Sequence, residues 1–383
     1  MLKITDITVD EFQDLAKNKR IFVFGAGAIC STLFQHLPLI SEKVLFLSDN
    51  DKNKQNKYCF YKRKIKVISP ETLSKKITHN DILIIASKYE TEILKQLSGL
   101  ITGVTCYSAS RLNQQFETRL FEPEMLKKLQ ATELEILKEF SRICNKHNLK
   151  YYLGGGTLLG AVRHGGFIPW DDDLDVLMPR KDFEKFAKLY YKELDSKYFF
   201  HFINTDKTYW LPFAKIRKNN TLFNEKNIAS ISAHKGIYID IFPLDDTPVQ
   251  ESTKNQKRNK LLNDLNNSIL AKRNIDVVLP INVWFYLPLR LTVKIRQYLM
   301  KNRNSDKNPF YINWGSNYNF VKQTMPKSVY GEGVKISFSN EYFIVPSDYE
   351  YVLKRIYGNN FMTLPPKEKR ITHSPLEIKF NDY

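Results

Sequence analysis

Cysteine is scarce in this chain, and no apolar run is long enough to cross a bilayer. The four cysteines among 383 residues are widely spaced and form no CxxC pair, which argues against a disulfide framework and a zinc site. The most apolar stretch, residues 277–293, contains two prolines and an arginine and is shorter than the roughly 20 residues that a spanning helix needs. The N-terminal MLKITDITVDEF lacks the basic start and apolar core of a secretory signal. We therefore expect a cytoplasmic protein without a membrane span.

Acidic residues are fewer than basic ones: the chain has 41 Asp and Glu and 58 Lys and Arg, which gives a net charge of +17. The excess is uneven, because residues 251–303 alone hold 11 basic and 3 acidic side chains. Such a run is either a solvated helical face or a surface for an anionic partner. Aliphatic rather than base-stacking residues accompany the positive charge, so we do not expect nucleic acid as the partner.

Residues 250–305 are predicted to form a basic amphipathic insertion. Between residues 287 and 301, apolar side chains recur on one helical face and basic side chains lie beside it. Two interpretations are open: ordinary packing onto the core, or a helix in a membrane interface, which implies peripheral contact with the inner membrane surface on its cytoplasmic face. The apolar residues are Leu287, Leu291, Ile295 and Tyr298, and the basic ones are Arg290, Lys294 and Lys301.

The chain is long enough for two domains, and its first 115 residues alternate short apolar strands with helical segments. Units of strand, helix and strand bring their strands together in parallel. We therefore predict an α/β protein whose residues 1–115 form a Rossmann-like domain with a parallel sheet. The predicted strands are 20–24, 44–48 and 82–86, and the predicted helices are 28–37 and 90–97.

A glycine turn, Gly25-Ala26-Gly27, follows the first predicted strand. This spacing begins the dinucleotide-binding fingerprint, and Asp49 stands where a ribose-binding acid belongs. Cys30 occupies the place of the third glycine, which weakens that interpretation. A tight turn in a structural domain and a pocket for a nucleotide or nucleotide sugar both stay open.

The second predicted domain, residues 116–383, opens with an amphipathic helix at 123–147 and is organised around LGGGTLLGAVRHGGFIPWDDDLDVLM at 153–178. Its glycines run into a helical segment, an arrangement that brings backbone N–H groups to a phosphate. Asp173 and Asp175 follow in a run with strand character, where their spacing points both carboxylates to one face. Carboxylates that face one way need a cation, and oxygen ligands favour a hard ion such as Mg²⁺.

Two further strands, predicted at 210–217 and 236–242, carry charged side chains. Asp240 lies among apolar residues, where an unpaired carboxylate is costly to bury. It is either a core or capping aspartate with its own partner, or a third carboxylate that faces the metal. Lys215 and Arg217 share one face of their strand.

Four cations are candidates for contact with a pyrophosphate, because phosphoryl transfer requires positive charge around the phosphates. For each of them, a surface salt bridge is the alternative. They are Arg163 and His164, which follow the glycine turn, and Lys215 and Arg217.

Together these motifs resemble the LicD/fukutin-related phosphotransferase family. The resemblance covers about residues 120–383 and rests on GGGTLLGAVRHGGFIPWDDDLDVLMPR, FAKIRKNNT, GIYIDIFPLDD and YGNNFMTLPPKEKRITH. It implies a nucleotidyltransferase-type α+β domain with a mixed sheet and a Mg²⁺ or Mn²⁺ site. The implied reaction transfers a phosphorylated alcohol, phosphocholine or an alditol phosphate, from a CDP-linked donor to a hydroxyl of a cell-surface glycan, free or lipid-linked, and releases CMP.

The resemblance also implies roles for individual residues. His373 would line the donor site. The general base is left open between Asp172, Asp240 and an acceptor hydroxyl activated by the metal alone. The implied metal ligands are Asp171, Asp173, Asp175 and Asp240, and the implied contacts to the donor phosphates are Gly155, Gly156 and Thr157.

Two other functions stay open: a nucleotidyltransferase that releases pyrophosphate, and an NAD- or nucleotide-sugar-binding protein that acts through residues 1–115. The transferred alcohol is also undecided. Choline would suit an aromatic cage, whereas ribitol or glycerol would need hydrogen bonds to its hydroxyls. The candidates for a cage are Trp170, Tyr151, Tyr152, Trp210 and Trp314.

Overall fold

Apolar runs and amphipathic segments become strands and helices in the computed structural model, which divides into two units. The structure describes the chain except residues 1, 62, 118–122, 226–230, 249–252, 274–278, 281–282, 302–303, 317, 319, 367–369, 371–374, 376 and 381–383. The N-terminal unit comprises Met1–Leu120, Lys226–Ile231 and Asp264–Thr292. The C-terminal unit comprises Phe121–Glu225, Ser232–Asn263 and Val293–Tyr383. The predicted insertion at 250–305 therefore contributes to both units.

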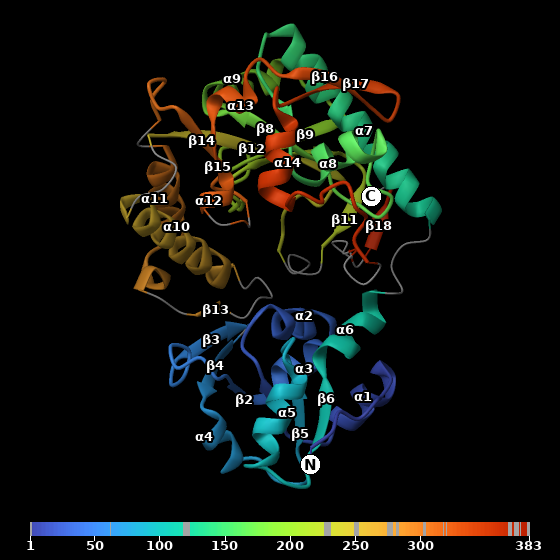
Figure 1. Ribbon diagram of the computed structural model, residues 1–383, viewed down its shortest axis with the longest axis vertical. Coiled ribbons are helices and arrows are strands. Elements are labelled where there is room, and N and C mark those ends of the chain that lie inside the picture. Colours follow the sequence, from blue (N-terminus) through green and yellow to red (C-terminus); the bar gives the residue numbers. More distant parts are fainter. Residues whose placement is uncertain are drawn as a thin grey trace. The chain divides into compact units, whose positions relative to one another are not determined.

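The N-terminal unit is built on one sheet with the strand order β13-β3-β4-β2-β1-β5-β6 (Figure 1). The pairs from β4 to β6 are parallel, whereas β3 and β13 add antiparallel pairs at one edge. Parallel pairing is thus confirmed for the strands from β4 to β6, whereas β3 and β13 make the whole sheet mixed. The assignment as Rossmann-like stays a prediction. The strands are β1 Ile21–Phe24, β2 Val44–Ser48, β3 Tyr58–Tyr61, β4 Arg63–Ile68, β5 Ile82–Ile85, β6 Thr105–Ser108 and β13 Leu279–Pro280.

Helices cover both faces of this sheet, which explains why its central strands are apolar throughout. On β1, Ile21 and Val23 face a core shared with Leu33 of α2, while Phe22 faces a core shared with Leu97 of α5. The helices are α1 Val9–Ala16, α2 Ala28–His36, α3 Pro38–Lys43, α4 Pro70–Ser74, α5 Glu90–Ser98 and α6 Ala109–Glu117. A short 3-10 helix, η2, spans Val283–Tyr286.

The C-terminal unit contains a mixed sheet with the order β15-β14-β12-β10-β9, to which β8 and β7 are added through β12. The β8–β12 pair is parallel and its other pairs are antiparallel. The predicted mixed sheet is confirmed, and the nucleotidyltransferase-type arrangement stays a prediction. The strands are β7 Tyr152–Leu153, β8 Asp175–Pro179, β9 Tyr198–His201, β10 Ala214–Lys218, β12 Tyr238–Thr247, β14 Phe310–Ile312 and β15 Thr324–Pro326.

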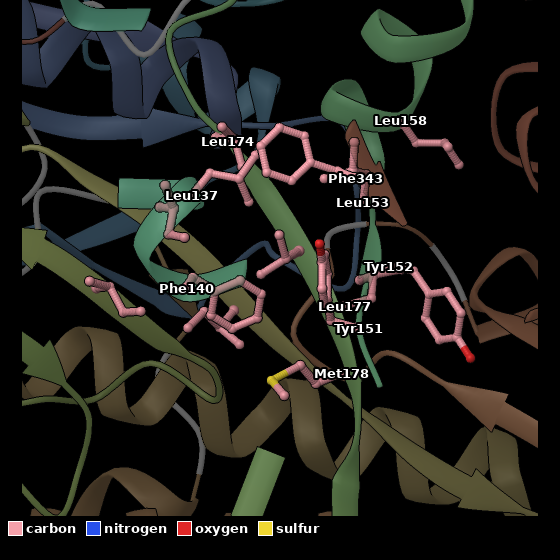
Figure 2. Close-up of a cluster of buried hydrophobic side chains, with 14 of the residues drawn as sticks. Leu137, Phe140, Tyr151, Tyr152, Leu153, Leu158, Leu174, Leu177, Met178 and Phe343 are labelled. Atoms are coloured by element: carbon pink, nitrogen blue, oxygen red, sulfur yellow. The ribbon is translucent and has the colours of Figure 1, made fainter. Parts of the chain in front are cut away.

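Two further two-stranded sheets and several helices complete this unit. The helix α7 buries Leu137 and Phe140 against Leu177 and Met178 of β8 in one apolar cluster (Figure 2). The paired strands are β11 Leu222–Asn224 with β18 Glu377–Lys379, and β16 Val334–Phe338 with β17 Glu341–Val345. The helices are α7 Pro123–Lys146, α8 Gly155–His164, α9 Arg180–Glu193, α12 Phe320–Gln323, α13 Lys327–Tyr330 and α14 Tyr349–Tyr357.

The insertion contributes α10 Thr253–Lys272 and α11 Leu289–Lys301. On α11 the buried residues include Arg296 and Met300, whereas Leu291 is 44% and Tyr298 is 67% exposed. The apolar face predicted from the sequence is therefore not the one that packs on the protein. Among the described residues, no helix combines the length and the apolar character needed to span a membrane.

Three predicted strand boundaries are wrong. β10 begins at Ala214 rather than at residue 210, because Pro212 has no N–H to donate to a neighbouring strand. β12 continues past residue 242 to Thr247, because β14 pairs with its last residues. β8 begins at Asp175, so Asp173 precedes the strand on which the spacing argument had placed it.

Candidate active site

The glycine turn at 154–156 forms the first turn of α8 and brings two carboxylates to the start of this helix. Gly155 has a φ of +48°, and a Cβ at this position would lie 2.5 Å from Oδ2 of Asp175. A Cβ on Gly156 would lie 2.7 Å from Oδ2 of Asp171. Adjacent glycines therefore leave the space that these two carboxylates fill. The sequence had placed the glycines before the helix, whereas they begin it.

Asp175 and Asp240 are neighbours in register on the parallel strands β8 and β12. Residues in register on adjacent strands point to the same face, about 4.8 Å apart along the sheet. Hydrogen bonds fix this edge: the Asp175 N–H donates to Oγ1 of Thr157 over 2.8 Å, and the Asp240 N–H donates to the Leu174 carbonyl over 2.8 Å. The first of these bonds explains why β8 begins only at Asp175.

Lys215 is the counter-ion of Asp240. It pairs with Asp240 in register between β10 and β12, and its Nζ lies 2.7 Å from Oδ1 of that carboxylate. Only 4% of Lys215 is exposed, so the pair is buried and the surface salt bridge considered for this lysine is wrong. The role of Lys215 in pyrophosphate contact stays a prediction.

The pKa shift of Asp240 indicates that other carboxylates lie nearby. Burial raises this pKa, Lys215 opposes the rise, and the charges of Asp173 and Glu225 raise the pKa further. Asp173 therefore lies within electrostatic range of Asp240 although it is not on a strand. Lys215 is the partner that Asp240 needs if it is a buried core aspartate. The alternative, that Asp240 faces a metal ion, stays a prediction.

Arg217 lies beside Lys215 on the same face of β10, as the spacing predicted. The Lys215 Nζ lies 3.3 Å and the Arg217 Cζ 4.8 Å from the centre of the Tyr238 ring. Arg217 is 2% exposed and donates from Nε to Nδ1 of His201 over 2.9 Å and from Nη1 to the Gly236 carbonyl over 2.8 Å. Its guanidinium is thus directed at protein groups, and the surface salt bridge considered for it is wrong.

His201 lies on β9 in register with Lys215 of β10, and its ring is held in one tautomer. Its Nδ1 accepts from Arg217, so its Nε2 donates to Oδ2 of Asp206 over 2.9 Å. Burial, followed by the charge of Arg217, lowers the pKa of His201 to about 3. The ring is therefore neutral at physiological pH and serves as a fixed support for Arg217.

Arg163 and His164 end α8 near the chain segment that follows α14. Arg163 donates from Nη1 to the Phe361 carbonyl over 3.0 Å. Burial lowers its pKa, while Tyr357 and Asp171 act in the opposite direction, which places both within electrostatic range. The His164 ring meets Trp170 edge-on at 6.3 Å, and burial, then Arg163, lowers the pKa of His164.

Two further predicted site residues are Asp172 and His373. Asp172 is 2% exposed, and His373 lies outside the described residues. In the part of the chain that the structure describes, no group of three or more His, Cys, Asp or Glu side chains forms a metal site. The oxygen donors beside Gly155 and Gly156 nevertheless have the chemistry that Mg²⁺ or Mn²⁺ requires, as does Asp240, which is neutralised by Lys215.

Three residues at this corner escaped the sequence analysis. Tyr238 donates to Oε1 of Glu225 over 2.9 Å, and Glu225 acts on Asp240. The pKa of Tyr357 is raised by burial, then by Tyr318, Asp175 and Asp171. Tyr238 could have been found, because it precedes Asp240 by two residues on one strand. Glu225 and Tyr357 come from parts of the chain that are distant from the central motif, so no local sequence pattern predicts that they lie at the site.

Comparison with known proteins matches parts of the chain to two families. Residues 148–271 match the family described as LicD/FKTN/FKRP, nucleotidyltransferase domain, and residues 17–105 match the family described as C2185-like, N-terminal. The lipopolysaccharide cholinephosphotransferase LicD of Haemophilus influenzae is 28% identical over 258 residues, which are 65% of this chain and 95% of that protein.

Shorter matches link the chain to ribitol 5-phosphate transferases named FKRP. The Mus musculus protein is 45% identical over 47 residues, or 11% of this chain and 10% of that protein. The Homo sapiens protein is 38% identical over 61 residues, or 16% of this chain and 12% of that protein. The chain therefore carries a LicD-family domain and is homologous to the LicD and FKRP transferases.

Proposed function

We propose that this chain transfers a phosphorylated alcohol from a CDP-linked donor to a hydroxyl of a glycan and releases CMP. The printed names of its relatives, a cholinephosphotransferase and ribitol 5-phosphate transferases, support transfer of a phosphoalcohol. The observation that supports the proposal most is the set of charged side chains where the start of α8 meets the start of β8. There Asp171 and Asp175 lie against adjacent glycines at the start of a helix, and Asp240 with Lys215 lies on the neighbouring strands.

The start of α8 suits a diphosphate. The first N–H groups of a helix, here those of Gly155, Gly156 and Thr157, have no partner one turn earlier and attract phosphate oxygens. Phosphoryl transfer depends mostly on positioning and charge neutralisation. The carboxylates of Asp171 and Asp175 would repel the same phosphates. We therefore include a divalent cation that would neutralise both the carboxylates and the phosphates.

In this proposal Mg²⁺ or Mn²⁺ is held by Asp171, Asp173, Asp175 and Asp240. When bound, such an ion stabilises charge on the phosphoryl oxygens and lowers the pKa of an acceptor hydroxyl. Lys215 holds the carboxylate of Asp240 in place between the strands. Asp240 and Asp172 both stay candidates for the general base.

The proposal is tested with the full chain, Mg²⁺ and a set of CDP-alcohols, with CMP measured by chromatography. We expect CMP release that EDTA abolishes and that Asp173→Ala lowers by about 10²-fold or more. Asp14→Ala is a matched control, because Asp14 is exposed on α1. Full activity of Asp173→Ala, or no CMP from any donor, would contradict the proposal.

A second candidate function is a nucleotidyltransferase that releases pyrophosphate. It is favoured by the description of the matched family as a nucleotidyltransferase domain. The same assay separates the two functions: pyrophosphate released from CTP, with no CMP from CDP-alcohols, supports the second candidate.

Peripheral contact with a membrane that carries a lipid-linked glycan is also part of the proposal. Leu291 and Tyr298 are exposed on α11, as are Arg290 and Lys294. Such a face suits the interface of an anionic bilayer. Flotation with vesicles of phosphatidylglycerol should carry the chain, and Tyr298→Ser with Leu291→Ser should leave it in the soluble fraction. Equal flotation of both proteins would contradict this contact.

A further inference from the structure

The second glycine pair of the central motif, Gly165-Gly166, turns the chain back along α8. Gly165 ends this helix with a φ of +67°, in the left-handed region that favours glycine. The returning chain touches the middle of the helix, because a Cβ on Gly160 would lie 2.5 Å from the Gly166 carbonyl oxygen. We call residues 165–171 the return loop. Its path brings Asp171 back to the first turn of α8.

A hairpin from a distant part of the chain holds the start of the return loop. The N–H of Ser339, in the turn between β16 and β17, donates to the Gly165 carbonyl over 2.8 Å. A Cβ on Gly166 would lie 2.6 Å from Oγ of Ser339, so glycine gives the hairpin room to approach. The ring centres of the neighbouring Phe167 and Phe338 lie 4.9 Å apart. Backbone and apolar contacts therefore fix this end of the loop.

Gln130 of α7 holds the other end of the return loop. Its Nε2 donates to the Asp171 carbonyl over 2.9 Å and to the Ile168 carbonyl over 3.3 Å. The Ile168 carbonyl also accepts from the Asp171 N–H over 2.9 Å, which closes a turn with Pro169 in its second position. One carboxamide therefore bonds to both ends of the turn that delivers Asp171.

The chemistry of glutamine suits this position. A carboxamide nitrogen carries two hydrogens, one for each carbonyl, and adds no charge beside the carboxylates. A glutamate would have no hydrogen to donate, and a lysine or arginine would bring a cation. The helix α7 is anchored in the apolar cluster of the C-terminal unit by Leu129 and Leu137, which are each 0% exposed. Gln130 therefore ties the return loop to a rigid element.

Asp171 needs such a support more than the carboxylates on strands do. Asp175 and Asp240 lie in register on β8 and β12, where sheet hydrogen bonds fix the main chain. Asp171 lies in a loop, and its Oδ2 occupies the space beside Gly156, 2.7 Å from where a Cβ would stand. A displacement of about 1 Å is enough to cost a reacting site about 10²-fold in rate.

We propose that Gln130 is a positioning residue that holds Asp171 at the first turn of α8 and thereby sets the affinity of the chain for a divalent cation. This inference rests on the proposed function, because Asp171 is a ligand of the cation there. In this role Gln130 acts through the main chain of Asp171 and contacts neither the cation nor the donor.

The first experiment measures Mn²⁺ binding to the full chain without a donor, by the EPR signal of the free ion. Gln130→Met keeps the length of the side chain and removes both hydrogen bonds, so the dissociation constant for Mn²⁺ should rise by about 10–100-fold. Gln55→Met is the matched control, because Gln55 also donates from Nε2 to a main-chain carbonyl, that of Asp49, over 2.9 Å. It should leave Mn²⁺ binding unchanged.

The outcomes separate this inference from the proposed function. An unchanged dissociation constant in Gln130→Met would overturn the inference and leave the proposed function standing. Absence of Mn²⁺ binding by the unaltered chain would contradict the metal site of the proposed function, and this inference with it.

A double-mutant comparison with Asp171→Asn separates positioning from a merely structural role. Once Asp171→Asn has removed the carboxylate, Gln130→Met should raise the Mn²⁺ dissociation constant by only about twofold more, because residues that act as a unit are not additive. A further rise as large as that in the unaltered chain would overturn the inference, since Gln130 would then act through another group.

The dependence of CMP release on Mn²⁺ gives a readout that a damaged fold would not reproduce. At saturating Mn²⁺ the kcat of Gln130→Met should return to within about threefold of that of the unaltered chain, because the bound cation then holds Asp171 in place. Gln130→Leu, a second variant without donors, should behave in the same way, and melting temperatures show that each variant folds. A kcat that stays low at every Mn²⁺ concentration in both folded variants would overturn the inference.

Discussion

The chain contains two glycine turns that lead from a strand into a helix, and they serve different purposes. Gly25 follows β1 with a φ of +107°, and Gly155 follows β7 with a φ of +48°. A Cβ on Gly25 would lie 2.3 Å from the Ala86 carbonyl oxygen, whereas a Cβ on Gly155 would meet the Asp175 carboxylate. The first turn allows two backbone segments of one sheet to approach closely. The second makes room for a carboxylate side chain.

The acidic residues beside the two turns explain this difference. Oδ2 of Asp49 accepts from the Ala26 N–H over 3.0 Å and pairs with Nζ of Lys54 over 3.0 Å. Burial raises the pKa of Asp49, but these groups and the Asp51 N–H outweigh it, so the pKa is lowered. Asp49 thereby closes its own turn, which argues against the ribose-binding role considered for it. A glycine turn alone does not define a phosphate site, because the carboxylates around it decide its use.

The largest effect should come from exchanging one carboxylate beside each turn. Asp175→Asn keeps the shape of the side chain and removes its charge, so we expect kcat for CMP release to fall by about 10²–10³-fold with little change in melting temperature. Asp49→Asn should leave kcat unchanged. It should lower the unfolding free energy by about 1–3 kcal/mol, because the amide loses the Lys54 pair and keeps only one acceptor oxygen for the N–H groups of Ala26 and Asp51. Equal losses of activity in both variants would remove the distinction between the turns.

The second effect is the pH dependence of stability, which we expect to differ between the two units. The pKa of His201 is about 3 in the folded chain, against 6.5 when unfolded, so the unfolded state gains a proton first as the pH falls. Stability is therefore complete above pH 6.5 and falls by about 1.4 kcal/mol per pH unit below it. The pKa of the partner Asp206 is lowered, despite burial, by Thr208 and His201, so its contribution is lost only at still lower pH.

Urea unfolding between pH 4.5 and 7, read by hydrogen exchange in β10 and in β1, measures this slope. We expect acid to weaken β10 more than β1, and His201→Gln to flatten the slope in β10. His79→Gln is the matched control, because His79 is exposed in the N-terminal unit. A slope that His201→Gln leaves unaltered would show that other groups bind the protons.

The smallest effect should come from adding one methyl group to each turn. In Gly156→Ala the new Cβ would displace the Asp171 carboxylate, which lies 2.7 Å away, so kcat should fall by about tenfold. Gly27→Ala is the counterpart, because nothing lies within 4 Å of a Cβ there, and it should change neither kcat nor stability. Similar kinetics for the two variants would show that the position of Asp171 is unimportant.

The sequence predicts this molecule well where local pattern decides the structure. The apolar runs of β1, β2 and β5 are strands within a residue of their predicted bounds. The spacing of Lys215 and Arg217 places both cations over Tyr238.

Prediction failed where distant residues intervene. Asp173 lies off the strand, because the Thr157 hydroxyl takes the N–H of Asp175. The Lys215–Asp240 pair depends on the register of two strands, and Glu225 and Tyr357 reach the site through tertiary structure alone. Arg370, whose Cζ lies 4.3 Å from the centre of the Trp170 ring, comes from a distant part of the chain. No spacing rule connects such residues.

Hydrogen exchange of the full chain with Mg²⁺ and CDP-ribitol tests the distinction between the two turns most directly, with Mg²⁺ alone as the reference. We expect the donor to protect the first turn of α8, residues 154–158, together with β8, and to leave the turn at 25–30 unchanged. Protection at 25–30 without protection at 154–158 would contradict it, because the donor would then bind at the first glycine turn.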